Sequence, residues 1–273
     1  MTTPYAEVIG DPIAQSKSPL IHTHWLKVLG MEGDYIRTHV TADGLADYLL
    51  ARRGDPAWRG CNVTMPHKET IIPLLDRLDP LAARIGAVNT VIPETDGTLT
   101  GYNTDAPGCF EPLAALSRGK RVLVLGNGGA ARAVLVALAD GGHMVALAAR
   151  NPVKAQALLD ELALEGKVID LAHVATPGLA EHDLVINASP LGMVGSSALS
   201  FHLSHLAPGG LVYDIVTAPL ETPLLRDARQ AGFQVVDGLA MLIGQAAAAF
   251  ALFFHAPAPR GDGDAALRAL LAA

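Results

Sequence analysis

Apolar and polar residues follow one another along this chain in a pattern that predicts strands and helices in turn. A short apolar run, rich in β-branched residues, extends from Val122 to Leu125, as expected for a strand buried on both faces. A helical period follows to about Asp140, where two glycines stop it, and a second strand is predicted from Met144 to Ala148. The pattern therefore predicts a βαβ unit in the middle of the chain.

Similar patterns flank this unit on both sides. Before it, strands are predicted over 5–9, 34–40 and 58–63, with helices between them, and a hairpin-like Asp96-Gly97 follows later. After it, strands are predicted over 184–188, 211–216 and 233–236, then a long helix from Gly238 and a last short helix over 265–271. Two successive runs of alternating strands and helices predict an α/β fold class with parallel sheets.

The turn between the first strand and the helix of the βαβ unit is rich in glycine. Gly126, Gly128 and Ala131 have the spacing G-x-G-x-x-A. Glycine here lets the backbone approach a pyrophosphate, which the partly positive N-terminus of the helix then holds. The alternative is an ordinary glycine turn in an α/β domain, but the position between strand and helix favours nucleotide binding.

The end of the second strand of the βαβ unit indicates which nucleotide binds. NAD-binding domains usually place a carboxylate here to accept a hydrogen bond from the ribose 2′-hydroxyl. This chain instead has Ala149, Arg150 and Asn151, with Lys154 one helical turn later. Two cations suit a 2′-phosphate, so NADP is the predicted cofactor. The alternative is a solvent-exposed helix start, although cations are unfavourable there unless an anion joins them.

Polar side chains follow the predicted strands of the N-terminal part. Ser16 and Ser18 lie on the loop after the first strand, and Ser18 is predicted to cap a helix that begins at Pro19 and ends at Gly30. Capping explains Ser18 but not the second hydroxyl at Ser16. Ligand sites of α/β proteins form where such loops leave the carboxyl ends of strands.

Three later strand ends also deliver polar residues. Lys68 is predicted in the first turn of a helix opened by Pro66, where a cation is unfavourable to the helix dipole. Asn89 and Asp105 each follow an apolar strand. A lone exposed lysine and turn-forming Asn and Asp are the plain alternatives. Because three successive strand ends each carry such a polar residue, a binding or catalytic site is favoured over these alternatives.

Length and composition limit the class of protein. At 273 residues the chain has room for two modest domains, and with half its residues hydrophobic it can bury large cores. A formal net charge of -7 and the absence of a basic run argue against a nucleic-acid partner. Cys61 and Cys109 are far apart, which predicts neither a disulfide nor a zinc site, and no metal is expected.

Further residues bear on location. His22 and His24 are interpreted as residues of a helix surface. The first residues lack a basic region followed by an apolar stretch, so no secretory signal is predicted. The apolar stretch from Leu239 to Phe254 is shorter than a membrane span and contains Gln245. A soluble, cytoplasmic protein without a membrane partner is expected.

Taken together, the motifs resemble those of the shikimate dehydrogenase family and occur in the family's order over nearly the whole chain. They are S-x-S-P at 16–19, NVTMPHK at 62–68, GAVNT at 86–90, G-x-NTD at 101–105, GNGGAAR from 126, NASPLGM from 187 and MLIGQ from 241. The resemblance implies a discontinuous substrate-binding domain, 1–104 with 239–273, and a Rossmann NADP-binding domain, 105–238, with the active site in a cleft.

The resemblance also implies roles for individual residues. Lys68 would be the acid-base residue, beside Asp105. The substrate-binding residues would be Ser16, Ser18, Thr64, Asn89, Asp105 and Gln245. The cofactor-binding residues would be Gly126, Asn127, Gly128, Gly129, Ala130, Arg150, Asn151 and Lys154, with Ile215, Gly238 and Met241 on the nicotinamide side.

Two positions depart from the family's pattern. Ala149 stands where the family often has Asn before the arginine, which removes one polar contact to the adenosine. Thr217 replaces a tyrosine that contacts substrate, so its shorter hydroxyl would reach the carboxylate through water or bind it more weakly.

The function implied by the resemblance is reversible, NADPH-linked reduction of 3-dehydroshikimate to shikimate in aromatic amino-acid biosynthesis, by a monomer or homodimer. Within enzymes, the alternatives are a quinate/shikimate dehydrogenase that uses NAD and a paralogue with an altered substrate. From another class, a nucleotide-binding regulator without turnover is the alternative, but such a protein needs no proton donor.

Overall fold

The computed structural model describes residues 3–272, which form two compact units. Unit 1 comprises the described residues up to Thr104 and from Gln245 onward, and unit 2 comprises Asp105–Gly244. Helix α9 (Gly238–Phe254) supplies residues to both units, and the domain boundary expected at 238–239 stays a prediction.

Unit 1 is built on a six-stranded sheet of order β2-β1-β3-β5-β6-β4. Its strands are β1 (Tyr5–Gly10), β2 (Asp34–His39), β3 (Trp58–Val63), β4 (Arg77–Leu78), β5 (Thr90–Pro93) and β6 (Leu99–Tyr102). β1 is parallel to β2 and β3, whereas β5 is antiparallel to β3 and β6. The turn between β5 and β6 contains Gly97 with φ 83°, in the left-handed region that favours glycine, so the predicted hairpin is confirmed.

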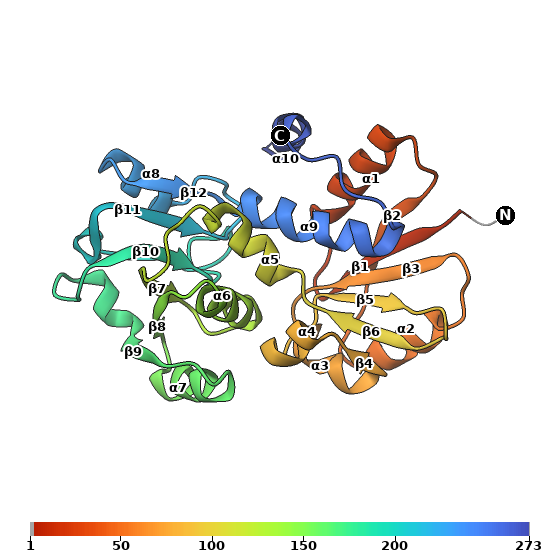
Figure 1. Ribbon diagram of the computed structural model, residues 1–273, viewed down its shortest axis with the longest axis horizontal. Coiled ribbons are helices and arrows are strands. Elements are labelled where there is room, and N and C mark those ends of the chain that lie inside the picture. Colours follow the sequence, from red (N-terminus) through yellow and green to blue (C-terminus); the bar gives the residue numbers. More distant parts are fainter. Residues whose placement is uncertain (1–2, 273) are drawn as a thin grey trace. The chain divides into compact units, whose positions relative to one another are not determined.

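Helices pack on both faces of this sheet (Figure 1). They are α1 (Ser18–Leu29), α2 (Leu45–Arg52), α3 (His67–Thr70), α4 (Pro80–Ile85) and the second part of α9, with a 3₁₀ turn at Ile72–Leu74. The last helix, α10 (Asp262–Ala272), contacts α1. Successive side chains of a strand point to opposite faces. Val8 therefore packs with Phe253 of α9, while Ile9 packs with Leu45 and Leu49 of α2 in a second core.

The start of α1 differs from the prediction. Helix α1 begins at Ser18 itself, Lys17 occupies the N-cap position, and no side chain caps the helix. The Ser18 hydroxyl instead accepts a hydrogen bond from the Ser16 hydroxyl at 3.3 Å. Pro66 likewise occupies the N-cap of the single-turn α3 rather than its first helical position. The predicted end of α1 is confirmed, because Gly30 closes it in the left-handed conformation.

The surface assignment of His22 is wrong. Its side chain is fully buried and stacks on the Tyr35 ring with centroids 4.0 Å apart. Trp25, Phe250 and Phe253 surround it, and neither ring nitrogen has a hydrogen-bond partner. Burial lowers the pKa of His22 to about 3, so the imidazole is neutral. The prediction failed because it treated His22 as a polar surface residue, whereas its imidazole occupies a position of α1 that faces the apolar core.

Unit 2 is built on a six-stranded, all-parallel sheet of order β12-β11-β10-β7-β8-β9. Its strands are β7 (Arg121–Leu125), β8 (Met144–Ala149), β9 (Gly166–Asp170), β10 (His182–Asn187), β11 (Leu206–Asp214) and β12 (Gln234–Val236). The first strand of the unit is central and the chain winds outward from it in both directions. This is the strand order of doubly wound dinucleotide-binding domains, as the βαβ pattern predicted.

The helices of unit 2 are α5 (Asp105–Phe110), α6 (Gly129–Asp140), α7 (Pro152–Glu161), α8 (Pro223–Gln230) and the first part of α9, with 3₁₀ turns at Glu111–Leu113, Leu171–Ala175 and Leu203–His205. Strand β11 starts five positions before the predicted Leu211. Its early part contains Pro208 and two glycines, which hid the strand pattern, and the pairing with β10 is irregular there.

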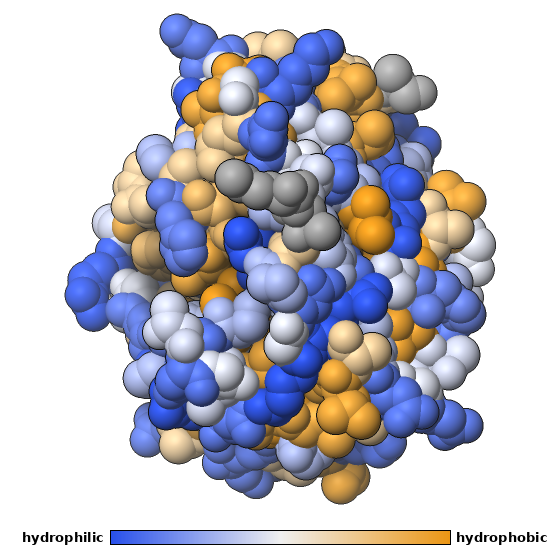
Figure 2. Space-filling model, turned by 90° about the vertical axis from the view of Figure 1, so that its right-hand side faces the viewer, coloured by the Kyte–Doolittle hydropathy of each residue, from blue (hydrophilic) through white to orange (hydrophobic). Residues whose placement is uncertain are grey.

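The two cysteines lie inside the protein and form no disulfide, as predicted. Cys61 and Cys109 are buried and unlinked, and burial raises the pKa of the Cys109 thiol to about 12. Apolar and polar residues are interspersed over the face shown in Figure 2. Among the described residues, every helix is too short or too polar to span a bilayer.

Candidate functional site

The glycine-rich turn of unit 2 lies between β7 and α6, where close packing requires glycine. Gly126 has φ 103°, and a Cβ on it would lie 2.9–3.0 Å from atoms of Ser189, on the loop after β10. Gly128 is the N-cap of α6, and Gly129 and Ala130 form its first turn. The turn therefore brings the helix N-terminus and the loop after β10 to the same edge of the sheet.

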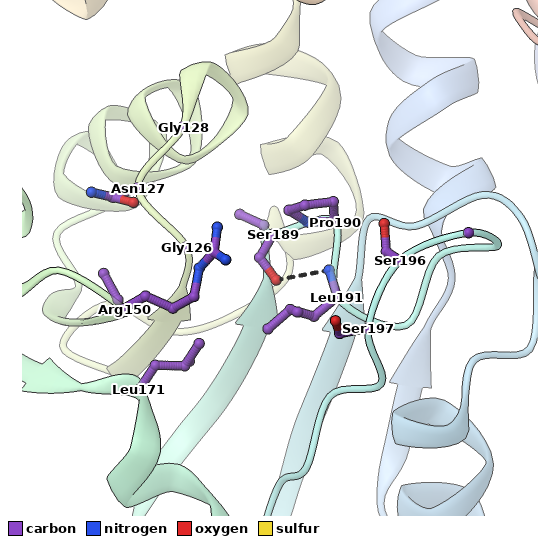
Figure 3. Close-up of a pocket in the computed structure, with 13 residues that line it drawn as sticks. Gly126, Asn127, Gly128, Arg150, Leu171, Ser189, Pro190, Leu191, Ser196 and Ser197 are labelled. Carbon is purple, nitrogen blue, oxygen red and sulfur yellow. Dashed lines mark hydrogen bonds between the residues drawn. The ribbon is translucent and has the colours of Figure 1, made fainter.

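A cavity of about 490 Å³ opens at this edge (Figure 3). The glycine turn, the end of β8 and the loop after β10 contribute most of its walls. Its lining residues are Gly126, Asn127, Gly128, Ala149, Arg150, Leu171, Ala188, Ser189, Pro190, Leu191, Gly195, Ser196 and Ser197. Its position is where open parallel sheets bind ligands.

Arg150 connects this cavity with a second one of about 350 Å³, because it lines both. Figure 3 shows its guanidinium beside the Gly126 turn. A phosphate at this place would meet a planar cation that can donate two parallel hydrogen bonds.

Two other predicted cofactor residues are bonded to each other at the start of α7, and their contact with the cofactor stays a prediction. The Asn151 side chain caps α7 by accepting a hydrogen bond from the Lys154 amide at 3.0 Å. Neither Asn151 nor Lys154 lines the two cavities described. The sequence could have predicted that the Asn151 side chain caps this helix, because asparagine directly before a proline is typical of a helix start.

The residues expected on the nicotinamide side form a separate group in unit 2. A Cβ on Gly238 would lie 2.6 Å from the Ile215 carbonyl oxygen and 2.3 Å from that of Val216. The start of α9 therefore packs directly on the segment after β11, which includes Thr217, and Met241 is buried one turn later. None of these residues lines the 490 Å³ cavity.

In unit 1, the loop carrying Ser16 and Ser18 is fixed by two cationic side chains. Arg37 of β2 donates to the Ser16 carbonyl oxygen through Nε at 2.8 Å and Nη2 at 2.5 Å. Lys17 donates from Nζ to the carbonyl oxygen of Leu271 in the last turn of α10, at 2.5 Å. The two serine hydroxyls are thereby held next to each other.

The loops after β1 and β3 pack together in the same unit. A Cβ on Gly10 would lie 2.5 Å from Cγ2 of Thr64, and the Asp11 amide donates to the Met65 carbonyl oxygen at 3.1 Å. Downstream, the Val88 amide donates to the Lys68 carbonyl oxygen at 2.7 Å. These bonds connect the segments that carry Ser16, Thr64, Lys68 and Asn89.

Asn89 lies in a buried network of amides and hydroxyls. Its Oδ1 accepts from the Thr104 amide at 2.7 Å, and its Nδ2 donates to the Thr104 hydroxyl at 2.9 Å. Asn62 donates from Nδ2 to the Thr90 hydroxyl at 2.9 Å and accepts from the Tyr35 hydroxyl at 2.5 Å. The sequence reasoning gave no role to Asn62, Thr90, Thr104 or Tyr35. The sequence signal that could have indicated this network was Asn62, a polar residue inside a largely apolar strand.

The remaining predicted residues belong to different units. Asp105 is buried and opens α5 of unit 2, while Gln245 is the first residue of α9 assigned to unit 1. Each unit therefore holds part of the predicted site, and the approach of Asp105 to Lys68 stays a prediction.

Comparison with known proteins agrees with these features. The model of the shikimate dehydrogenase substrate-binding domain matches residues 8–91, and that of the shikimate 5′-dehydrogenase C-terminal domain matches residues 238–268. A curated protein of Sphingopyxis alaskensis named shikimate dehydrogenase (NADP(+)) is 54% identical, over 99% of this chain and 98% of its own length.

Solved structures are similar over the same length. Shikimate 5-dehydrogenase of Thermus thermophilus, in complex with NADP(H) and shikimate, is 36% identical with a TM-score of 0.85, covering 97% of this chain and 99% of its own. Quinate dehydrogenase of Corynebacterium glutamicum, in complex with NAD, is 30% identical with a TM-score of 0.86, covering 99% of both chains. By the extent and identity of these matches, the chain belongs to the shikimate dehydrogenase family.

Proposed function

We propose that the protein catalyses the reversible, NADPH-linked reduction of 3-dehydroshikimate to shikimate. The observation that carries the proposal is the 54% identity, over nearly the full length, to a protein named shikimate dehydrogenase (NADP(+)). The two units support it with separate parts. Unit 2 has a glycine-lined cavity next to a helix N-terminus, and unit 1 has hydroxyls and amides that suit a polyol acid.

The residues of unit 2 fit NADP. Gly126 leaves space where a Cβ would collide with Ser189, and the α6 N-terminus adds a partial positive charge. Arg150 lines the cavity, and positions 149–151 carry no carboxylate that would repel a 2′-phosphate. Gly126, Asn127, Gly128 and Arg150 would hold the cofactor, with Ile215 and Gly238 toward its nicotinamide.

NADPH, when held there, would supply the hydride that reduces the ketone carbon of the substrate. Lys68 donates a proton from Nζ to the ketone oxygen, so that the carbonyl becomes an alcohol. In the oxidation direction the same nitrogen accepts the proton. Asp105 would hold the ammonium in place, and Ser16, Ser18, Thr64, Asn89, Thr217 and Gln245 would bind the acid and its hydroxyls.

The comparisons also favour one alternative function. The similar quinate dehydrogenase was solved with NAD, and quinate is a related polyol acid. Initial rates with NADPH and 3-dehydroshikimate, followed by the loss of NADPH absorbance, test the proposal. Quinate with NAD is the comparison. Faster turnover of that pair would replace the proposal, and binding without turnover of either pair would indicate a regulator.

A cytoplasmic location and a monomer or homodimer are part of the same proposal. A biosynthetic reductase needs the reduced nicotinamide pool of the cytoplasm. Sedimentation of the purified protein measures its oligomeric state.

Removal of the Arg150 guanidinium should weaken NADP selectively. A charge-assisted hydrogen bond is worth ~1.5–3 kcal/mol, and ~1.4 kcal/mol is tenfold. We expect Arg150→Ala to raise the KM for NADP by roughly tenfold to a hundredfold and to leave the KM for NAD nearly unchanged. Arg226→Ala on α8, which removes an exposed arginine paired with Asp227, is the control. Equal losses for both cofactors would show that Arg150 has a structural role.

Removal of the Ser16 hydroxyl should weaken substrate binding and leave NADP binding unchanged. Arg37 holds this loop through the Ser16 backbone carbonyl, so Ser16→Ala keeps the loop in place. We expect the shikimate KM to rise by roughly twofold to tenfold, as for one lost hydrogen bond of ~0.5–1.5 kcal/mol. Thr98→Ala at the β5–β6 turn serves as the control. Calorimetry that shows weaker NADP binding by Ser16→Ala would remove this loop from the substrate site.

A further inference from the structure

A buried carboxylate in unit 2 has no place in the proposed proton transfer. Asp214 ends β11 and is fully buried, directly across from Asn187 at the end of β10. Its Oδ1 accepts from Asn187 Nδ2 at 2.9 Å and from the Val216 amide at 3.1 Å, and its Oδ2 accepts from the Thr222 hydroxyl at 2.7 Å. Three donors thus converge on one carboxylate.

Asn187 connects Asp214 with the wall of the cofactor cavity. Its Oδ1 accepts from the Ser189 amide at 3.1 Å and from the Ser189 hydroxyl at 2.7 Å. Its Nδ2 donates to the Leu191 carbonyl oxygen at 3.0 Å. Ser189 and Leu191 line the 490 Å³ cavity, and Figure 3 shows the Ser189 hydroxyl bonded to the Leu191 amide. One buried amide therefore holds both ends of this loop.

The carboxylate decides which way that amide faces. A carboxylate only accepts hydrogen bonds, so Nδ2 of Asn187 must turn toward Asp214, which leaves Oδ1 toward Ser189. The opposite orientation would place two oxygens in contact and oppose the Ser189 amide with the NH₂ group. Burial raises the pKa of the Asp214 carboxyl, whereas the hydrogen bonds from Thr222, Val216 and Asn187 act in the opposite direction and favour its charged form.

We infer that Asp214 is a positioning residue for cofactor binding, acting through Asn187 on the Ser189–Leu191 loop. An apolar pair at these two strand ends would continue the apolar runs of β10 and β11 and would avoid burying a charge. Asp214 and Asn187 instead fix the Ser189–Leu191 loop, which lies beyond the last residue pair of β10 and β11. The Val216 amide donates to the same carboxylate, so the segment carrying Ile215 and Thr217 is fixed by the same group.

The inference rests on the proposed binding of NADP, and a double-mutant cycle on that binding tests it. We expect Asp214→Ala and Asn187→Ala each to raise the Kd for NADP⁺ by roughly tenfold, equivalent to ~1.4 kcal/mol, in calorimetric titrations. Because both residues act on the same loop, the Kd of the double variant should be little higher than that of the weaker-binding single variant. Asp214→Asn can still accept from Asn187 and Val216, so its Kd should rise by no more than about threefold.

The matched control lies at the other end of the neighbouring strand β10. Asp183 accepts from the Arg121 amide at 2.8 Å, away from the cavity. Asp183→Ala should lower the thermal midpoint without changing the Kd. If Asp183→Ala weakened NADP⁺ as much as Asp214→Ala, or if the two losses in the cycle added fully, Asp214 would have only a structural role.

A second readout needs neither cofactor nor substrate. The Ser189 amide donates to Asn187, so its hydrogen exchange should be faster in Asp214→Ala and nearly unchanged in Asp214→Asn. Unchanged exchange in Asp214→Ala would overturn the inference. A wild-type protein that binds NADP⁺ but does not turn over shikimate would overturn the proposed reaction alone, and one that does not bind NADP⁺ would overturn both.

Discussion

Replacement of Lys68 by alanine is expected to lower kcat for 3-dehydroshikimate reduction by roughly 10²–10⁴, which is the usual contribution of general acid-base catalysis. The substrate KM should change much less, because hydroxyls and amides of unit 1 bind the acid. The protein should remain folded, since the helix that carries Lys68 is a single turn held by backbone bonds, including that of the Val88 amide to the Lys68 carbonyl oxygen. Steady-state kinetics in both directions measure the effect.

The alternative role for Lys68 is to anchor the substrate. In that case Lys68→Ala would raise KM strongly and leave kcat intact, which would contradict the assignment. The oxidation direction adds a second test. The same nitrogen must accept the proton when shikimate is oxidised, so kcat for oxidation should fall in Lys68→Ala by a factor similar to that for reduction. Asp105→Asn is the companion variant, with an expected decrease in kcat and weaker shikimate binding.

Backbone architecture was largely predictable from the sequence because it rests on local signals. The apolar run that became β7 was predicted within one residue at both ends, α6 ends at Asp140 as predicted, and the left-handed Gly30 ended α1 as predicted. These features depend on the hydrophobic period and on glycine, both of which are visible in a single sequence. Strand β11 was partly missed because Pro208 and two glycines interrupted its pattern.

Side-chain partners were less predictable because they depend on which segments meet. Ser18 pairs with Ser16 rather than capping α1, and Asn151 caps α7 rather than lining a cavity. Asn187 and Asp214 are far apart in sequence and meet only because β10 and β11 are neighbours in register. Such pairs carry no local sequence signal, and although Asn187 opens the NASPLGM motif, the family resemblance implied no role for it.

The buried His22 is expected to make unit 1 sensitive to acid. The pKa of His22 is about 3 in the folded protein and 6.5 in an unfolded chain. Between these two pH values the unfolded state therefore binds a proton that the folded state does not bind. Stability is therefore fully present above the unfolded pKa of 6.5 and is lost as the pH falls below it, down to about 3. Between pH 7 and pH 4.5 this histidine alone should lower the free energy of unfolding by roughly 2–3 kcal/mol.

His22→Leu should remove this part of the acid sensitivity, since leucine binds no proton. The groups that face the imidazole are aromatic rings, and of these only Tyr35 is titratable, with a pKa that burial raises further from the acid range. Urea unfolding followed by tryptophan fluorescence measures the effect in this unit, because both tryptophans, Trp25 and Trp58, belong to it. His24→Leu, the same change at a partly exposed position of α1, should retain the wild-type loss. An equal decrease in stability from pH 7 to pH 4.5 in wild type and His22→Leu would mean that His22 is protonated in the folded protein, and that carboxylates elsewhere determine acid unfolding.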